Sequence, residues 1–100
     1  MTWDPTQTDQ ARSNRARKVE VIVLHGWQRG LSGDDVAAMT SRQRSRLARA
    51  AGVRVPNRGS VTWPLVVDRL RAFEVAAQTD PWHPLAWQRL TGERDQWLRP

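Results

Sequence analysis

Apolar residues recur at helical spacing in the first third of the chain, at Val19, Ile22, Val23, Gly26 and Trp27. Positions i, i+3 and i+4 share one face of an α-helix, so the pattern predicts a helix from Gln10 to about Arg29, with Asp9 as its N-cap. The run VEVIVL (19–24) is also rich in the β-branched residues typical of strands, but the spacing and the absence of a partner strand favour the helix. Gly30 can end this helix in the left-handed conformation.

A short second helix is expected to begin at Ser32. Asp34 and Asp35 would lie at its N-terminal end, where the helix dipole favours negative charge. Its apolar side would consist of Val36, Ala37 and Met39.

A third helix is expected from about Arg42 to Ala51, with Thr40 or Ser41 as its N-cap and Gly52 at its end. The residues expected to face the core are Leu47, Ala50 and Ala51. The residues expected together on the opposite face are Arg42, Ser45, Arg46 and Arg49.

Residues 53–60 predict a loop, because they include Pro56, Asn57 and Gly59. Thr62 would then cap a fourth helix, with a proline in its first turn. This helix carries the clearest apolar stripe of the chain, formed by Trp63, Val66, Val67, Leu70, Phe73 and Ala77.

A last helix is expected near residues 85–98, opened by Asp80 or His83, each of which precedes a proline. Gly92 is a point at which this helix can break. Its shared face would carry Trp87, Leu90, Arg94, Trp97 and Leu98.

Together these elements predict an all-α protein, a compact bundle of four to five short helices. The sequence has no internal repeat, and no parallel sheet can be built from its pattern. Residues 1–8 are polar and contain Pro5, so we expect a flexible N-terminal arm followed by a single helical domain over residues 9–100. One hundred residues is the size of one small domain with one modest core.

Six tryptophans would supply much of the apolar area of that core. Those on apolar stripes, which we expect to pack inside, are Trp27, Trp63, Trp87 and Trp97. Trp3 and Trp82 lie outside the clear stripes. They would stack on bases, contact a partner protein or cover the ends of the core.

The net charge of the chain is +6, and Lys18 is the one basic residue that is not arginine. The planar fork of arginine suits phosphate groups and base edges, although GC-rich coding also favours arginine. No Asp or Glu occurs between Val36 and Val67, whereas this segment contains Arg42, Arg44, Arg46, Arg49, Arg54 and Arg58.

Concentrated positive charge favours binding to a phosphate backbone, because each neutralised phosphate releases condensed counterions. The segment 36–67 therefore predicts contact with nucleic acid, and the alternative is a solvated helix face. The first helix is also basic and could touch the backbone through Arg12, Arg15, Arg17 and Lys18.

Two expected helices, SGDDVAAM (32–39) and SRQRSRLARAA (41–51), are separated by a tight turn. Ala37 holds a small-residue position, Ser41 holds the turn position usually occupied by Gly, and Leu47 and Ala50 would anchor the second helix. Arg42 departs from the apolar residue expected just after the turn. Over residues 31–67 the pattern resembles the helix-turn-helix element of small DNA-binding proteins of the phage repressor, Cro and excisionase types.

A second register of the same resemblance uses RLARAAGV (46–53), which is similar to the common L-A-x-x-x-G-V ending of a scaffold helix. In this register Val61 comes three residues late, so the turn would need an insertion. The helix that follows would expose Leu65, Asp68 and Arg69, which are poorly suited to reading bases.

We prefer the first register, because its recognition helix at about 42–51 would present arginines to guanine edges or to phosphates in the major groove. Loop residues would add phosphate or minor-groove contacts. The expected DNA-binding residues are Arg42, Gln43, Ser45, Arg46, Arg49, Arg54, Asn57 and Arg58.

Several kinds of chemistry have no support in the sequence. Without cysteine there is no disulfide, thiolate zinc site or cysteine nucleophile. His25 and His83 have no further ligand at metal-binding spacing, and helix capping explains Asp34 and Asp35. With no phosphate-binding Gly-rich loop and no Ser-His-Asp set, we expect no enzyme, no cofactor or metal ion and no small-molecule substrate.

The longest apolar run, residues 21–24, is far too short to cross a bilayer, and the N-terminus has no signal-peptide pattern. We therefore expect a cytoplasmic protein without a membrane partner. The preferred function is a small transcriptional regulator that binds double-stranded DNA, either sequence-specifically or generally.

DNA half-sites usually match protein symmetry, so a homodimer is a further expectation, with contacts from Leu65, Trp97 and Leu98. The alternative function is a protein-interaction module, an adaptor or inhibitor that uses an Arg/Trp surface. Arginine and tryptophan are the residue types enriched in interface hot spots.

Overall fold

The computed structural model describes residues 5–57, 59–90 and 92–99 and contains no strand within them. The helices are α1 (Pro5–Gln28), α2 (Gly33–Ala37), α3 (Ser41–Ala50), α4 (Trp63–Thr79), α5 (Pro84–Gln88) and α6 (Arg94–Leu98). The predicted all-α class is confirmed. None of the described helices is both long enough and apolar enough to span a bilayer.

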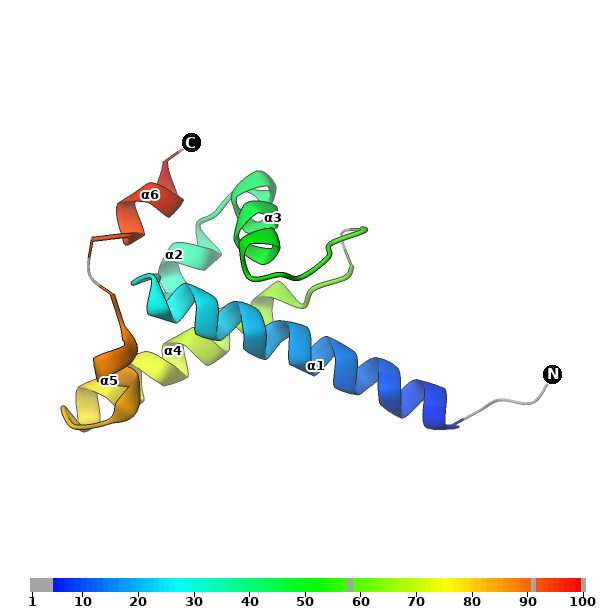
Figure 1. Ribbon diagram of the computed structural model, residues 1–100, viewed down its shortest axis with the longest axis horizontal. Helices are drawn as coiled ribbons and strands as arrows, with labels where there is room; N and C mark the ends of the chain where they lie inside the picture. The colour runs from blue at the N-terminus through cyan, green and yellow to red at the C-terminus, as the bar shows by residue number, and fades with distance from the viewer. Residues whose placement is uncertain (1–4, 58, 91, 100) are drawn as a thin grey trace.

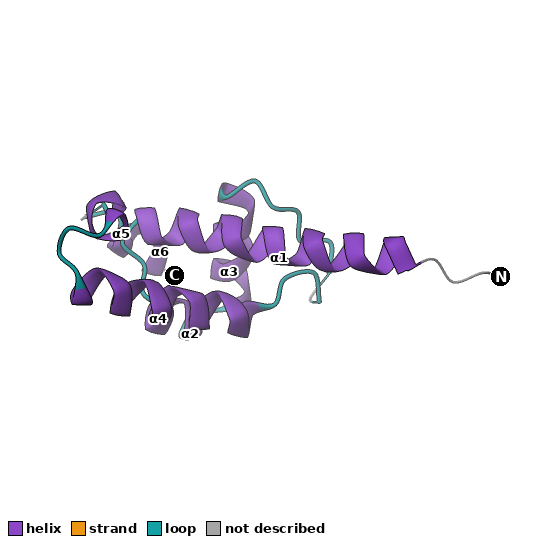
Figure 2. Cartoon of the chain, turned by 90° about the horizontal axis from the view of Figure 1, so that it is seen from below, coloured by secondary structure: helices purple, strands orange, loops and turns teal. Residues whose placement is uncertain are grey.

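The two long helices, α1 and α4, lie side by side and carry the shorter helices (Figures 1 and 2). Helix α1 begins at Pro5 rather than near Gln10, so residues 5–8, expected in an arm, are helical. Residues 1–4 of that arm lie outside the described residues. The N-terminal half of α1 extends past the other helices in both views.

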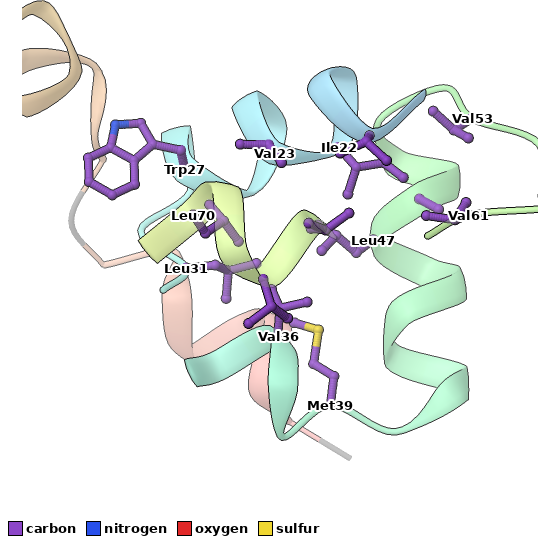
Figure 3. Packing of buried hydrophobic residues seen from close by; sticks show 14 residues of the cluster. Ile22, Val23, Trp27, Leu31, Val36, Met39, Leu47, Val53, Val61 and Leu70 are labelled. Carbon is purple, nitrogen blue, oxygen red and sulfur yellow. The ribbon is translucent and has the colours of Figure 1, made fainter. Parts of the chain in front are cut away.

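The core lies where α1, α2, α3 and α4 meet (Figure 3). Its fully buried side chains include Ile22, Val23, Trp27, Leu31, Val36, Leu47 and Leu70. Trp27 is the largest of them, and its indole Nε1 donates a hydrogen bond to the Leu85 carbonyl oxygen (2.7 Å) while Phe73 meets its ring edge-on. This one side chain therefore joins α1 to both α4 and α5.

Short-range signals set the ends of the middle helices. The Ser32 and Asp35 side chains form a reciprocal capping box with each other's backbone N–H at the start of α2, and Thr40 and Gln43 do the same for α3. Gly52 ends α3 with a φ of +81°, a value that few other residues adopt. The expected starts and stops of these two helices are confirmed to within one or two residues.

The orientation of the third helix differs from the expectation. Ala48 is fully buried beside Leu47, whereas Ala50 is exposed and Ala51 is half-buried. Which residues of α3 face the core depends on where α1 and α4 lie. The sequence of α3 does not reveal this face, because the helix has few large apolar residues. In α2, Ala37 is likewise exposed, while Val36 and Met39 are buried as expected.

The expected last helix is two short helices, α5 and α6, and Trp87 and Leu90 are largely exposed rather than packed. After α5 the backbone is extended at Arg89, and the Leu90 N–H donates to the Gln28 carbonyl oxygen at 2.8 Å. Gly92 then turns the chain with a φ of +98°. A hydrogen bond to α1 therefore interrupts what the sequence alone suggested was one helix.

Candidate nucleic-acid interface

Four arginines in the described part of the chain are paired with carboxylates. The pairs are Arg29–Glu93 (3.9 Å), Arg69–Glu20 (2.9 Å), Arg71–Asp34 (2.9 Å) and Arg94–Asp35 (2.7 Å). Hydrogen bonds from Arg94 and Ser32 hold the pKa of the buried Asp35 carboxyl below its ordinary value, although burial acts in the opposite direction. The charge of these arginines is therefore matched within the protein.

Three further arginines donate hydrogen bonds to main-chain carbonyl oxygens, and each also lies over an aromatic ring. Arg44 bonds the last carbonyls of α2 and covers the Trp63 ring. Arg46 bonds the carbonyls of α6 and covers Trp97, and Arg89 bonds the Gly30 carbonyl and covers Trp27. Positive charge is favoured at a helix C-terminus, so these three arginines stabilise the fold.

Among residues 11–57, 59–90 and 92–99, whose side chains are described, the remaining cations have no carboxylate or carbonyl partner. They are Arg12, Arg15, Arg17, Lys18, Arg42, Arg49, Arg54 and Arg99. Arg12 and Arg15 lie on the projecting half of α1, and Arg17 and Lys18 follow at the middle of the helix. Residues 11–17 are all exposed. The nearest carboxylate along α1 with a described side chain beyond them is Glu20, which Arg69 already binds.

Two adjoining hollows, each of about 470 Å³, lie at the end of α3. One is bounded by the middle of α1, and the other by the segment that follows α3. The lining of the first is Asn14, Arg17, Lys18, Val21, Ala51, Gly52 and Val53. The lining of the second is Arg49, Gly52, Val53, Arg54, Val55 and Pro56. We name them together the basic groove. Its described lining contains four cations and neither an acidic nor an aromatic side chain.

The predicted DNA-binding residues divide into several groups in the structure. Arg42, Arg49 and Arg54 are exposed, and Ser45 is half-buried. Gln43 and Arg46 are held by α6, as their amide and guanidinium groups donate to carbonyls of residues 96–99. All three arginines of the expected stripe Arg42, Arg46 and Arg49 are therefore exposed, but one guanidinium nitrogen of Arg46 is already bonded to α6.

The loop residues expected at the site are only partly described. The Asn57 side-chain oxygen accepts hydrogen bonds from the Gly59 N–H and the Ser60 hydroxyl, both at 3.1 Å, so it organises the turn. Arg58 lies outside the described residues. Of the loop cations, only Arg54 has a described position on the basic groove.

The two helix-turn-helix registers correspond to different geometries. In the first, the five-residue α2 and the ten-residue α3 are joined through the short segment 38–40. In the second, α3 and α4 are separated by residues 51–62. The first register thus gives a short turn, but α6 lies against the helix that would read bases.

The cations of α1 are not among the DNA-binding residues that the sequence predicts. The available signal was the segment 10–19, which contains Arg12, Arg15, Arg17 and Lys18 and no acidic residue. Its position beside the end of α3 depends on the packing of α1, which the sequence does not reveal. No protein-family model matches the chain, and neither a curated protein nor a solved structure is significantly similar to it.

Proposed function

We propose that the protein binds double-stranded DNA through the basic groove, the projecting half of α1 and the open side of α3. The observation that carries this proposal is that some arginines are paired with carboxylates of the protein and others are not. Those on α4 and α6 are neutralised by carboxylates of the chain itself, whereas the cations around the groove have no described partner. Their mutual repulsion is relieved when phosphate groups come close.

A duplex suits this surface better than a single strand. Proteins that hold single strands without sequence preference usually stack bases on aromatic side chains. The described lining of the basic groove has no aromatic residue, and the exposed Trp82 and Trp87 belong to the α5 region, at the opposite end of the molecule from the projecting half of α1 (Figure 1). Cations without stacking partners support contact with phosphates along a duplex.

A finer proposal is a small transcriptional regulator of the helix-turn-helix kind, with α3 in the major groove. Arg42 and Arg49 lie two helical turns apart on its open side and would contact guanine edges or phosphates. Selection from a random duplex library tests this proposal. An enriched motif whose recovery depends on both arginines would support base reading, and the absence of a motif would leave general DNA binding as the function.

Salt dependence tests the general proposal. Binding of a random-sequence duplex is measured by fluorescence anisotropy, and affinity should fall by orders of magnitude between about 50 and 200 mM salt. The double variant Arg49→Ala/Arg54→Ala should lower the slope of log affinity against log salt by about 2, since each phosphate contact contributes about 0.9. Absence of binding by the wild-type protein at low salt would refute the proposal.

The matched control is Arg69→Ala/Arg71→Ala, which removes the same net charge from exposed ion pairs on α4. Exposed pairs contribute little to stability, so this variant should fold. It should keep the wild-type slope. If both double variants lowered the slope equally, net charge rather than the basic groove would explain binding.

A second candidate function is a protein-interaction module, and the exposed aromatic pair Trp82 and Trp87 favours it. Their side chains are 77% and 68% exposed, with ring centroids 5.9 Å apart. Of the expected homodimer contacts, Leu65 is exposed, but Trp97 and Leu98 pack against the protein's own core. Sedimentation equilibrium of the wild type and Trp87→Ser tests whether this pair supports a homodimer.

A further inference from the structure

Helix α6 lies against the side of α3 but contributes no buried residue to the core. Its first residue, Arg94, is held strongly, because its guanidinium makes two 2.7 Å bonds to the buried Asp35 carboxylate. The last turn is held differently, through its main-chain carbonyls and one half-buried tryptophan. The two ends of this short helix therefore differ in how firmly they are attached.

The carbonyl groups at the end of α6 occupy donors on α3. The Arg46 guanidinium donates to the oxygens of Gln96 (3.3 Å) and Trp97 (2.9 Å), and the Gln43 amide donates to those of Leu98 (3.2 Å) and Arg99 (3.4 Å). These bonds are long or solvent-accessible. They join neutral carbonyls to two side chains, Gln43 and Arg46, that the sequence predicts at a nucleic-acid surface.

Trp97 is the main apolar contact of this last turn. Its ring lies under the Arg46 guanidinium at 5.5 Å and edge-on to the His25 imidazole at 6.0 Å. Both contacts contribute little free energy, since the groups involved keep partial access to solvent. An anionic ligand that bound Arg46 would compete directly with this arrangement.

We propose that the last turn of α6 is a displaceable cover over α3, and that DNA phosphates take the donors of Gln43 and Arg46 that its carbonyls hold. The inference rests on the proposed DNA binding, and it adds that the last turn of α6 regulates the affinity for DNA. A phosphate oxygen is a stronger acceptor than a carbonyl because it carries charge. Displacement completes the basic stripe Arg42, Arg46 and Arg49, while the Arg94–Asp35 pair keeps the start of α6 in place.

The test uses point substitutions in the full chain, with Gln96→Pro as the main variant. The Gln96 side chain is exposed, but its N–H donates to the Glu93 carbonyl (3.1 Å), and proline removes that bond and disfavours the helical conformation of the preceding residue. The matched control is Gln96→Ala, which preserves the helix. Trp97→Ala provides a second, independent way to release the turn, and hydrogen exchange follows release in each variant.

Gln96→Pro and Trp97→Ala should bind random duplex DNA roughly three- to tenfold more tightly than the wild type and should increase the salt slope by about one phosphate contact. Gln96→Ala should match the wild type. Adding Arg46→Ala to Gln96→Pro should remove most of the gain in affinity and return the salt slope to the wild-type value. A merely structural role of α6 would not predict this dependence on Arg46.

The outcomes separate the two proposals. If wild-type protein binds duplex DNA and neither Gln96→Pro nor Trp97→Ala binds more tightly, the cover is refuted and the proposed function stands. A gain in affinity that persists after Gln43→Ala and Arg46→Ala are both added to Gln96→Pro also refutes it, because the donor uncovered would then be another group. If no variant binds DNA at low salt, both proposals fail together.

Discussion

Arg42 and Arg44 are only two residues apart on α3, but their surroundings are different. Arg42 is exposed without a described partner, whereas Arg44 donates to the Val36 carbonyl through two nitrogens (3.2 and 3.1 Å) and lies 5.7 Å from the centre of the Trp63 ring. Residues two apart point about 200° away from each other on a helix. At the residue scale, side-chain direction rather than residue type separates structural arginines from those available for binding.

Arg44→Ala should therefore lower the free energy of unfolding by about 1–3 kcal/mol, because it leaves the last carbonyls of α2 without a charged donor. Arg42→Ala should change it by less than about 0.5 kcal/mol and should instead weaken DNA binding. Urea denaturation and the anisotropy assay measure the two effects. Equal losses of stability in both variants would contradict this division of roles.

His25 makes stability depend on pH. Burial and the neighbouring Arg29 hold the pKa of His25 below its usual value of about 6.5, with Glu93 acting in the opposite direction, and its Nε2 is buried without a described hydrogen-bond partner. The unfolded chain therefore binds a proton at a higher pH than the folded chain. The resulting stability is complete above about pH 6.5 and is lost as the pH falls toward the folded pKa.

The urea concentration at the unfolding midpoint should accordingly decrease when the pH is lowered from about 7.5 to about 5.5. His25→Gln should make this decrease smaller. Asp35 does not interfere, since its pKa is lowered and its contribution to stability is lost only at more acidic pH. If the variant showed the same dependence as the wild type, another group would have to be responsible.

At the scale of elements, the close approach of α2 to α4 depends on one glycine. A Cβ atom at Gly33 would lie 2.7 Å from the Val67 carbonyl oxygen and 2.6 Å from Arg71 Cγ. The backbone oxygen cannot move without shifting α4. Gly26, in the last turn of α1, differs because a Cβ there would meet its nearest neighbour, Leu31, at 3.7 Å, an ordinary contact.

Gly33→Ala should therefore destabilise the protein by about 1–3 kcal/mol, as overpacking does in other cores. Gly26→Ala should stabilise it by up to about 1 kcal/mol, because alanine is the better helix former and the space exists. Thermal and urea unfolding of the two variants provide the comparison. A stable Gly33→Ala protein would mean that α2 and α4 are farther apart than described.

At the scale of the whole molecule, the cations of the basic groove lie beside the projecting half of α1, whereas the exposed Trp82 and Trp87 belong to the α5 region at the opposite end (Figure 1). Residues 11–17 of α1 are all exposed and include Arg12, Arg15 and Arg17, which lie three or fewer residues apart. Such a helix gains little from packing and is weakened by its own charges. A bound polyanion would remove that unfavourable term.

Duplex DNA at about 100 times its Kd should consequently stabilise the protein by about 2.7 kcal/mol. Amide exchange in residues 11–18 should slow more than exchange near α5, since the projecting half of α1 is expected to contact the phosphates. Calorimetry and hydrogen exchange with and without DNA measure both effects. Uniform slowing over the whole chain would indicate stabilisation without this localised contact.

Much of the fold could be predicted because its signals are local. Ser32 and Thr40 begin helices by bonding backbone groups three residues away, and Gly30 and Gly52 end helices through their own backbone conformation. The apolar stripe around Val66 and the burial of Trp27 also followed from spacing. Sequence therefore determined the helical class, most helix ends and the accumulation of cations in two acid-free segments.

Tertiary structure alone decided which cations remain available. Arg46 and its carbonyl partner Trp97 are 51 positions apart, and Arg94 and Asp35 are 59 positions apart, so neither pairing leaves a local pattern. The same is true of the break before Gly92, which depends on a hydrogen bond to α1. Charge composition is fixed by the sequence, but its neutralisation depends on contacts made when distant segments pack together.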